Sequence, residues 1–518
     1  MRTFRDTNLL YIGVVVALVP VMVLRDFTPD NELRYLSIAD EALRQHAYFA
    51  FTNHGVPYAD KPPLYLWIVM LLRWLTGAHR MWLLSLVSLL PALGVVQLMN
   101  RWCWQSGRDD SIALAAPMLL TSAFFMGAAV ALRMDMLMCL FIVLALYTFW
   151  QRLTLAEAPK RFAWRFPVCL FLAVFTKGPL GLLIPFCATT VYLAVTHRLR
   201  LWTAFWGWRT WLVLLAGMAL WLGAVYAEGG SAYLYNLTVH QTVDRAVHSF
   251  HHSRGALYYV GSIWYIIAPW SLLVLGTVAM ALRRWKTACP LQQFFLTVGV
   301  VTFVLLSCIS GKLQIYLLPA LPFLIYGAAL SLGHAAPARW QRVALGVPCV
   351  ALALALPAVC VAVRMGVSPL ADVIPVYVAA AILSIGGVAT LVILGLRATT
   401  DMQPRAVRSL VATLLLAVYS AGWAVPHLNR QIGYGTVCHS ARWLSARYDT
   451  SRFYTWRISR ADNIDVYLQH PVSTVPDSLL PPRAAGWGYV LITDTASARS
   501  LGARQVEYAG PYAAVVWR

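Results

Sequence analysis

The chain has 518 residues, of which 60% are hydrophobic and only 12% are charged. A soluble domain of this length would carry about twice that charged fraction, so the composition excludes that class and indicates an integral membrane protein. The formal net charge of +20 is spread along the chain instead of forming one basic patch, which argues against a nucleic-acid partner. The nine cysteines show neither metal-ligand nor redox spacing.

About thirteen segments are long and apolar enough to cross a bilayer, which takes roughly 17–25 residues each. They begin near Asn8, Met81, Ser111, Asp135, Phe166, Pro179, Trp211, Leu257, Gln293, Ile315, Gln341, Val373 and Ala406. The first one meets Arg25 and Asp26 without a small-residue cleavage site, so we expect it to stay as a span. A further apolar stretch, Pro62 to Thr76, is shorter and carries Arg73, and we expect it to lie at the outer membrane edge.

Basic residues fall on every second loop, and this alternation sets the predicted topology. Cytoplasmic loops retain an excess of Lys and Arg, so the basic loops mark the inside, the N-terminus lies inside and the C-terminus outside. The pattern holds only if Pro62–Thr76 does not cross. The predicted inner loops contain Arg2, Arg5, Arg101, Arg108, Arg152, Arg198, Arg200, Arg283, Arg284, Lys286, Arg339, Arg342, Arg405 and Arg408.

Three predicted outer segments are long enough to carry function. The first loop, Arg25 to Arg80, contains a predicted amphipathic helix over Glu32–Arg44, and the second, Glu228 to Gly255, is rich in His and Arg. Hydropathy drops after Pro426, which divides the chain into a membrane domain (1–427) and a small outer α/β domain (428–518) of viable core size. Its helix-like pieces are Val437–Arg447 and Asn463–Gln469, and its strand-like pieces are Arg452–Trp456, Gly488–Thr493 and Ala513–Trp517.

Acidic side chains appear at two places on the predicted outer face. The segment PDNELRY supplies Asp30, Glu32, Arg34 and Tyr35, and in isolation it is typical of a solvated helix start with Asp30 as the N-cap. Asp135, beside Arg133, begins a span in apolar surroundings, where an ionisable residue is costly and indicates function. Two such carboxylates can activate a nucleophile, hold a metal or stabilise a cationic transition state.

Isolated cations also interrupt the pattern on the outer face, where they suit a phosphate or pyrophosphate group held by point charges and forks. The cations are Lys61, Lys177, Arg245, Arg254 and Lys312, with Tyr58, Asp60, His240 and Tyr316 near them in sequence. Lys177 lies in a very tight predicted turn. The run HSFHH has no established ligand spacing, so the residues themselves do not favour a zinc site.

These motifs, in this order, resemble the GT-C membrane glycosyltransferases, specifically the aminoarabinose transferase and protein mannosyltransferase group. The resemblance covers nearly the whole chain and rests on the acid-Arg-Tyr motif, Lys61-Pro62-Pro63, the turn Thr176–Gly178 and the segment from Lys312 to Tyr316. It implies a polytopic helical GT-C fold with a small outer α/β domain. It also implies transfer of a sugar, expected to be 4-amino-4-deoxy-L-arabinose, from a polyprenyl-phosphate donor to lipid A or another envelope acceptor, on the periplasmic face of the inner membrane.

The resemblance further implies roles for single residues. Lys61, Arg245 and Tyr316 match positions that hold the donor phosphate, Tyr58, Lys177 and Lys312 lie with them, and Arg34 and Tyr35 match the Arg-Tyr of the first-loop motif. Asp135 matches the acid of the second outer loop, and Asp60 and His240 match a pair that could bind a divalent metal. The family usually reads Asp-Glu-x-Arg-Tyr, whereas this chain has Asn31 before Glu32 and Asp30 one position upstream. Either Asp30 or Glu32 is therefore expected to be the principal acid.

The expected chemistry is an inverting transfer, which needs a positioned acceptor oxygen, a carboxylate and cations on the departing phosphate. A protein mannosyltransferase or a lipid-linked polymer ligase would use similar residues and is the alternative enzyme. A lipid or sugar transporter is the alternative outside enzymes, but the odd number of spans, the missing repeat symmetry and the long outer loops disfavour it.

The topology is directly testable with reporter fusions. Fusions after Arg101, Arg200 and Arg283 should report the cytoplasm, because the basic loops stay inside. Fusions after Gly55, Gly229 and Trp456 should report the outside. A cytoplasmic signal after Trp456 would mean that Pro62–Thr76 crosses the membrane.

Overall fold

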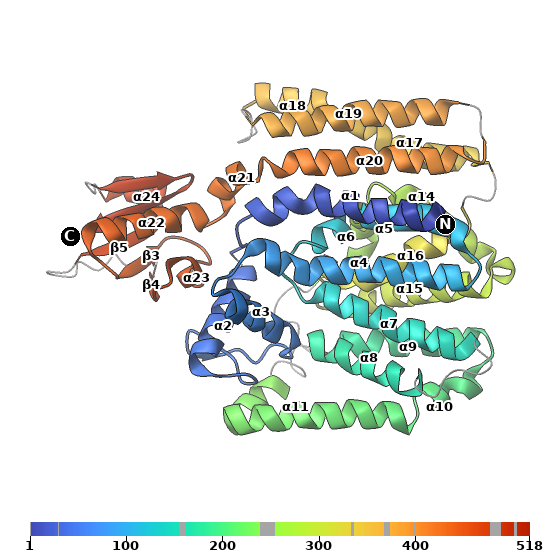
Figure 1. Cartoon of the computed structure of the whole chain (residues 1–518), viewed down its shortest axis with the longest axis horizontal. Helices are drawn as coiled ribbons and strands as arrows, with labels where there is room; N and C mark the ends of the chain where they lie inside the picture. The colour runs from blue at the N-terminus through green and yellow to red at the C-terminus, as the bar shows by residue number, and fades with distance from the viewer. Residues whose placement is uncertain are drawn as a thin grey trace.

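The computed structural model describes residues 2–29, 31–154, 162–238, 254–332, 336–366, 373–396, 399–476, 488–501 and 505–517, and most of them are helical. Figure 1 shows a broad bundle of roughly parallel and antiparallel helices with a small mixed domain at one end. The bundle helices are α1 (Arg2–Leu24), α4 (Met81–Gln105), α5 (Ile112–Leu120), α6 (Ala123–Ala128), α7 (Asp135–Thr154), α8 (Phe162–Lys177), α9 (Leu180–Val195), α10 (Trp202–Phe205), α11 (Trp208–Tyr235), α13 (Tyr258–Ile266), α14 (Ser271–Arg283), α15 (Pro290–Cys308), α16 (Leu321–Ala329), α17 (Arg339–Ala353), α18 (Ala355–Arg364), α19 (Ile374–Gly395) and α20 (Met402–Gly422).

A helix or a pair of short helices occupies each position predicted to cross the membrane. Among the described residues, eight helical segments are long and apolar enough to span a bilayer by themselves. The remaining positions hold shorter helices, such as α9, or helices interrupted within the predicted span, such as α5–α6 and α13–α14. The 3-10 turn η5 (Gln314–Ala320) leads into α16 and contains Pro319, which lacks the amide hydrogen that a regular helix would use there.

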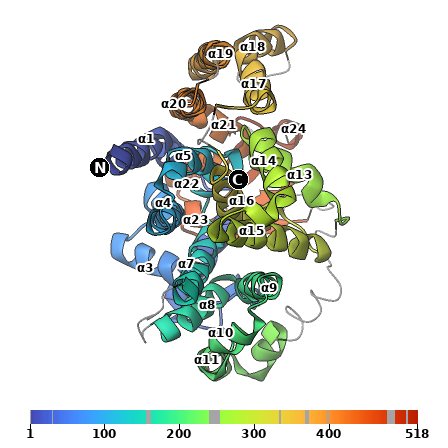
Figure 2. The ribbon, with the colours of Figure 1, turned by 90° about the vertical axis from the view of Figure 1, so that its right-hand side faces the viewer.

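The bundle has three groups of helices when it is viewed along its long axis (Figure 2). Helices α17–α20 lie on one side, α8, α10 and α11 lie on the other, and α4, α5, α15 and α16 lie between them. The large buried cluster in the middle includes Trp102, Phe149, Phe294 and Tyr326. The outer helices are apolar on their exposed sides, as a surface in contact with lipid must be.

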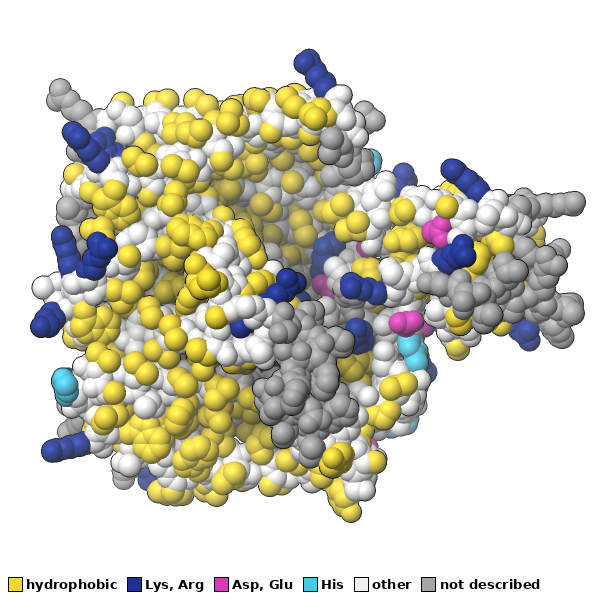
Figure 3. Space-filling view, turned by 180° about the vertical axis from the view of Figure 1, so that it is seen from behind, with side chains coloured by type: hydrophobic (Ala, Val, Ile, Leu, Met, Phe, Trp, Pro, Cys, Tyr) yellow, Lys and Arg dark blue, Asp and Glu magenta, His cyan; other side chains and the backbone are white. Residues whose placement is uncertain are grey.

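The surface confirms the alternation of apolar and basic segments. In Figure 3 the sides of the bundle are covered with hydrophobic side chains, and Lys and Arg gather along the edge remote from the small domain. Exposed apolar residues on these sides include Leu215, Leu220, Ile385 and Val392. The basic edge corresponds to the loops that the sequence places on the inside.

The first outer loop forms two helices at the end of the bundle that also carries the small domain (Figure 1). The predicted amphipathic helix is α2 (Glu32–Gln45), with Leu33, Leu36 and Ala39 buried. Pro62–Thr76 provides α3 (Leu64–Thr76), which has only 13 residues and lies against α2. Between them stand two short strands, β1 (Thr52–Asn53) and β2 (Val56–Pro57).

Helices α2 and α3 are joined by charge as well as by packing. Arg73 Nε donates to Asp40 Oδ1 at 2.8 Å, and His79 Nε2 lies 3.1 Å from the same oxygen. Burial alone would raise the pKa of Asp40, but these two partners outweigh it and lower the pKa below its usual value. Arg73 was the residue that argued against a membrane span for this segment. Through Asp40 it instead ties α3 to α2 at the end of the bundle.

The tail forms a five-stranded sheet with strand order β4-β3-β5-β7-β6. Strands β3, β4 and β5 are parallel, and β6 and β7 are antiparallel additions at the other edge. The predicted pieces all appear, but β4, β6 and α24 were not predicted, because they are short and only partly buried. The elements are α21 (Val425–Ile432), α22 (Gly435–Tyr448), β3 (Phe453–Trp456), α23 (Asp465–Leu468), β4 (Val472–Val475), β5 (Tyr489–Asp494), α24 (Thr495–Ser500), β6 (Val506–Ala509) and β7 (Tyr512–Trp517). The expected boundary at 427/428 falls within α21.

The small domain shares a hydrophobic core with α2. Leu36 and Ile38 of α2 belong to the same buried cluster as Val437 of α22, Ile464 and Val490. Polar contacts add to this core, since Ser37 Oγ donates to Asp465 Oδ2 at 3.1 Å and His54 Nε2 lies 3.5 Å from that oxygen. The outer loop is thus held between the bundle and the small domain.

This contact should depend on pH. The hydrogen bond with Asp465 raises the pKa of His54 above its usual value, against the opposing effect of burial, and Glu41 and Asp462 add to the increase. Protonated His54 therefore stabilises the docked domain at a pH below its unfolded pKa of about 6.5, and this stability is lost as the pH rises through the higher folded-state pKa.

Hydrogen exchange in α23, corrected for the intrinsic effect of pH, should accelerate as the pH rises above about 6.5 and through the raised folded-state pKa of His54. His54→Asn should abolish the pH dependence, and asparagine tolerates the positive φ of 53° at this position. Equal pH dependence in the variant and the parent protein would assign the effect to another group.

Candidate active site

A buried carboxylate joins the two predicted outer acid segments. Arg25 follows α1, and both of its terminal guanidinium nitrogens donate to Glu32. Nη1 lies 2.7 Å from Oε2 and Nη2 lies 2.9 Å from Oε1. The backbone amides of Thr28 and Leu132 donate to the same carboxylate at 2.8 and 2.9 Å. Glu32 is only 3% exposed, and burying its charge would be costly without partners. These four donors compensate for the water that the carboxylate loses. The N-cap of α2 is Asn31, whereas the sequence predicted Asp30.

A second carboxylate fixes the chain that precedes Lys61. Glu228, near the end of α11, accepts hydrogen bonds from the backbone amides of Tyr48, Phe49 and Ala50 at 2.9, 3.0 and 2.9 Å. Tyr233, one turn further on, donates to the carbonyl oxygens of Phe51 and Tyr58, at 3.2 and 2.8 Å. The end of α11 therefore positions the segment that carries Tyr58, Asp60 and Lys61.

Lys61 lies among aromatic rings and one acid. Its Nζ is 2.8 Å from Asp60 Oδ2, the Tyr58 hydroxyl donates to the same oxygen at 3.4 Å, and Nζ stands 5.9 Å from the centre of the Tyr35 ring. Burial alone would lower the pKa of Lys61, but Tyr35, Tyr58 and the ionised Asp60 raise it well above its usual value. The ammonium therefore stays charged at neutral pH.

The second half of the site is a buried ion pair. Lys177 Nζ donates to Asp135 Oδ1, and both side chains are less than 10% exposed. Arg133 Nε lies 3.6 Å from the other oxygen of Asp135, and Lys177 Nζ stands 4.5 Å from the ring centre of Tyr316. Asp135 begins α7 and Lys177 ends α8, so the predicted outer ends of two adjacent helices meet here.

The tight turn after Lys177 depends on two glycines. Gly178 has φ +96°, which favours glycine, and the turn returns the chain at once into α9. A Cβ on Gly181 would lie 2.4 Å from the backbone of Ala173, so α9 can pack against α8 only with glycine there. This close packing directs Lys177 toward Asp135.

The two halves form one cluster. Asp60, Lys61, Arg133 and Asp135 all lie close enough to the Tyr316 hydroxyl to interact with it electrostatically. Tyr65 is completely buried beside Tyr35, with ring centres 5.6 Å apart, and interacts with Asp135 and Arg133 as well. Residues from five separate segments, which sequence could only place on the same face, thus share one site.

Some residues of the cluster were not assigned a role from the sequence. Arg133 was noticed only as a neighbour of Asp135, Arg25 only as the end of a span, and Tyr65 was missed. Tyr65 lies on the first turn of α3, just after Lys61-Pro62-Pro63, and this closeness in the sequence was the one available signal.

Not all predicted residues fall within the cluster. Lys312 is 3% exposed, and its Nζ donates to the carbonyl oxygens of Ile309 and Arg254, the latter at 3.1 Å. It therefore joins the loop after α15 to the chain before α13. Asp30, His240 and Arg245 lie outside the described residues.

The predicted metal pair stays a prediction, because His240 lies outside the described residues. Within the described ranges, no three His, Cys, Asp or Glu residues gather in a way that could hold an ion. Asp60 accepts hydrogen bonds from Lys61 and Tyr58.

The cluster can bind an anion and act on a neighbouring hydroxyl. Lys61, Arg133 and Lys177 supply positive charge, and Tyr58 and Tyr316 supply hydroxyl donors near them. Burial at the end of the bundle lowers the local dielectric and strengthens these interactions. A carboxylate beside such a site can accept a proton from an attacking group.

Comparisons with known proteins give relatives of one kind. No family model matches the chain. It is 23% identical over 375 residues to the undecaprenyl phosphate-alpha-4-amino-4-deoxy-L-arabinose arabinosyl transferase of Shewanella sediminis (strain HAW-EB3), covering 70% of this chain and 68% of that protein. It is 25% identical over 323 residues to the protein of the same name from Pseudomonas savastanoi pv. phaseolicola, covering 61% and 59%.

Solved structures show the same fold over the full length. The crystal structure of ArnT from Cupriavidus metallidurans bound to undecaprenyl phosphate matches with a TM-score of 0.78 and 17% identity, covering 100% of this chain and 98% of that one. The apo state of that protein matches with a TM-score of 0.76. The predicted GT-C fold and the resemblance to the aminoarabinose transferases are confirmed.

Glu32 should prove to be a structural residue. Glu32→Gln keeps the shape but removes the charge that Arg25 faces, so the free energy of unfolding should fall by roughly 3 kcal/mol, a low value for a buried pair because Arg25 is partly exposed. Thermal unfolding in detergent would measure this loss. Asp30→Asn should leave stability unchanged and abolish transfer, whereas Glu32→Gln should retain partial transfer. An inactive but fully stable Glu32→Gln protein, together with active Asp30→Asn, would make Glu32 the principal acid.

Proposed function

We propose that this chain transfers a sugar from a polyprenyl-phosphate donor to an acceptor on the outer face of the membrane, with inversion at the anomeric carbon. The observation that carries the proposal is the gathering of Lys61, Lys177 and Arg133 around Asp135 and Tyr316 at the end of a membrane bundle. Cations placed there can hold the phosphate of a lipid whose chain stays in the bilayer. The names of the related transferases support the same class of donor.

The sugar is proposed to be 4-amino-4-deoxy-L-arabinose, because that group appears in the names of the related proteins. The proposed acceptor is lipid A, as the family resemblance implies. The polyprenyl-phosphate donor and lipid A are both lipids, so their polar heads can meet at one interface. We accordingly propose that the protein lies in the inner membrane, with the cluster and the small domain on the periplasmic face.

In the proposed reaction the acceptor oxygen attacks the anomeric carbon from the side opposite the phosphate. The new carbon–oxygen bond forms as the bond to the phosphate oxygen breaks, and the electron pair of that bond leaves with the phosphate. The acceptor proton passes to a carboxylate, for which Asp30 and Asp135 are the candidates. Lys61 and Arg245 are proposed to stabilise the departing phosphate, with Tyr316 and Tyr58 as hydroxyl donors.

The buried pair of Asp135 and Lys177 suits this reaction for a second reason. Asp135 places Lys177 close to Tyr316 before any donor arrives, so little reorganisation is required when the phosphate acquires charge. Arg34 and Tyr35 lie on the first turn of α2, which Glu32 holds in place. Both are proposed to contact the donor from that side.

Donor binding and transfer can be separated experimentally. Lys61→Ala and Arg245→Ala should each weaken the binding of polyprenyl phosphate by about tenfold or more, since a lost charge-assisted hydrogen bond is worth roughly 1.5–3 kcal/mol. Asp30→Asn should abolish transfer and leave donor affinity largely intact, because a carboxylate does not help to hold an anion. Asp135→Asn should also abolish transfer, but it should weaken donor binding as well, because Asp135 positions Lys177. Lys286→Ala, which removes a cation from the opposite edge, is the matched control and should change neither.

The assay combines purified protein in lipid, the polyprenyl-phosphate-linked aminoarabinose and lipid A, with mass spectrometry of the product. Lipid A should gain one sugar residue. Transfer to a polypeptide or polymer, but not to lipid A, would favour the mannosyltransferase or ligase alternative. Movement of the donor into proteoliposomes without any transfer would contradict the proposal and favour a transporter.

A further inference from the structure

A second polar site lies at the far end of the bundle from the cluster. A pocket of about 460 Å³ opens between the end of α14, the start of α15, the end of α16 and the start of α17. Helix α15 runs from this pocket toward the loop that leads to Tyr316, and its 19 residues are about 28 Å long. The pocket is therefore separate from the proposed catalytic site.

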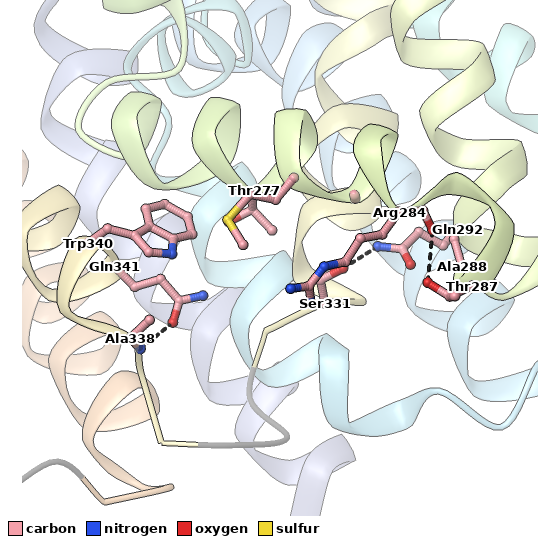
Figure 4. Close-up of a pocket in the computed structure, with 11 residues that line it drawn as sticks. Thr277, Arg284, Thr287, Ala288, Gln292, Ser331, Ala338, Trp340 and Gln341 are labelled. Atoms are coloured by element: carbon pink, nitrogen blue, oxygen red, sulfur yellow. Dashed lines mark hydrogen bonds between the residues drawn. The ribbon is translucent and has the colours of Figure 1, made fainter.

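The lining is polar on facing walls. In Figure 4, Trp340 and Gln341 come from the α17 side, and Arg284, Gln292 and Ser331 face them from the other. Gln292 is 5% exposed, and its Nε2 donates to the Gly327 carbonyl at 2.9 Å and to Ser331 Oγ at 2.5 Å. A buried amide held in this way is a fixed polar wall and not a loosely solvated side chain.

Arg284 supplies the charge. Within the described part of the chain, its guanidinium has no ion-pair or hydrogen-bond partner, and the lining contains no acid. Lys286, Arg339 and Arg342 lie near the lining residues in the sequence, and residues 284–289 and 331–342 include no Asp or Glu. The pocket therefore has a strongly positive rim and a donor fork that is available for a phosphate.

The pocket also opens toward the lipid-facing surface. Met280 and Trp340 form its apolar side, and along α17 the next turns expose Val343 and Val347. A Cβ on Gly276 would lie 2.7 Å from the Trp340 ring, so the indole packs directly on α14. Tryptophan at this depth is typical of the membrane–water interface.

We propose that this pocket binds the phosphate headgroup of an anionic glycerophospholipid in the leaflet opposite the catalytic cluster. Arg284 holds the phosphate, Gln341 and Ser331 contact the polar remainder of the headgroup, and the acyl chains follow the exposed apolar side of α17. The lipid bridges α14 and α17, and this adds to the contacts through which α20 already joins the peripheral layer α17–α20 to α1 and α5 (Figure 2).

The experiment uses the full chain, stripped of lipid in detergent, with phosphatidylglycerol, phosphatidylcholine or inorganic phosphate as the probe. Native mass spectrometry counts bound lipid, and thermal unfolding reports stabilisation. Phosphatidylglycerol should bind and raise the unfolding temperature, and phosphatidylcholine should do so much less. Arg284→Gln should weaken phosphatidylglycerol binding by about tenfold, whereas the neighbouring Arg283→Gln, outside the pocket lining, should bind as the parent protein does.

Ser331→Leu fills the opposite wall without changing any charge, and it should weaken binding even if Arg284→Gln folds poorly. If Arg283→Gln and Arg284→Gln weakened phosphatidylglycerol binding equally, the lipid would be attracted to the basic edge in general, and the proposed site would be overturned. If millimolar inorganic phosphate alone raised the unfolding temperature as much as phosphatidylglycerol does, the ligand would be a soluble phosphate, and this would overturn the lipid assignment. Parent-like binding by both Arg284→Gln and Ser331→Leu would also overturn it.

Discussion

The arrangement of the outer face depends on the carboxylate of Glu32. It is buried where α1 ends, and a carboxylate in such a place is stable only if donors surround it. Arg25 and the backbone amides of Thr28 and Leu132 fill that requirement, and they belong to the chain before α2 and to the turn before α7. One charge therefore fixes α2 relative to the start of α7, and with them the separation between the first-loop motif and Asp135.

The same constraint explains the cluster around Asp135 and Lys61. Charges at the edge of an apolar bundle are costly alone, and each one in the cluster has a partner: Lys61 pairs with Asp60, and Lys177 pairs with Asp135. The pairs leave positive charge in excess, because Arg133 adds a third cation to two acids. The negative charge of a phosphate would balance this excess positive charge. A site whose lysines already have acidic partners can therefore still attract an anionic donor.

The outer loop is supported from three directions. Glu228 and Tyr233 of α11 hold the chain before Lys61, Arg73 of α3 holds α2 through Asp40, and the small domain covers the other face of α2. These supports come from the bundle, from α3 and from the small domain. Helix α2 is therefore positioned by packing against both domains.

Much of this protein could be predicted from its sequence, because hydropathy and the placement of cations respond directly to the bilayer. The helical positions, the short helix α3, the C-terminal α/β domain and the presence of Lys61, Lys177, Asp135 and Tyr316 at one end of the bundle all follow from those local signals. The partners of the charges could not be predicted. Glu32 pairs with Arg25, Lys312 binds carbonyl oxygens, and Arg133 and Tyr65 join the cluster, because such contacts depend on how segments far apart in the chain pack together. Local sequence decided which residues reach the interface, and only tertiary packing decided which of them meet there.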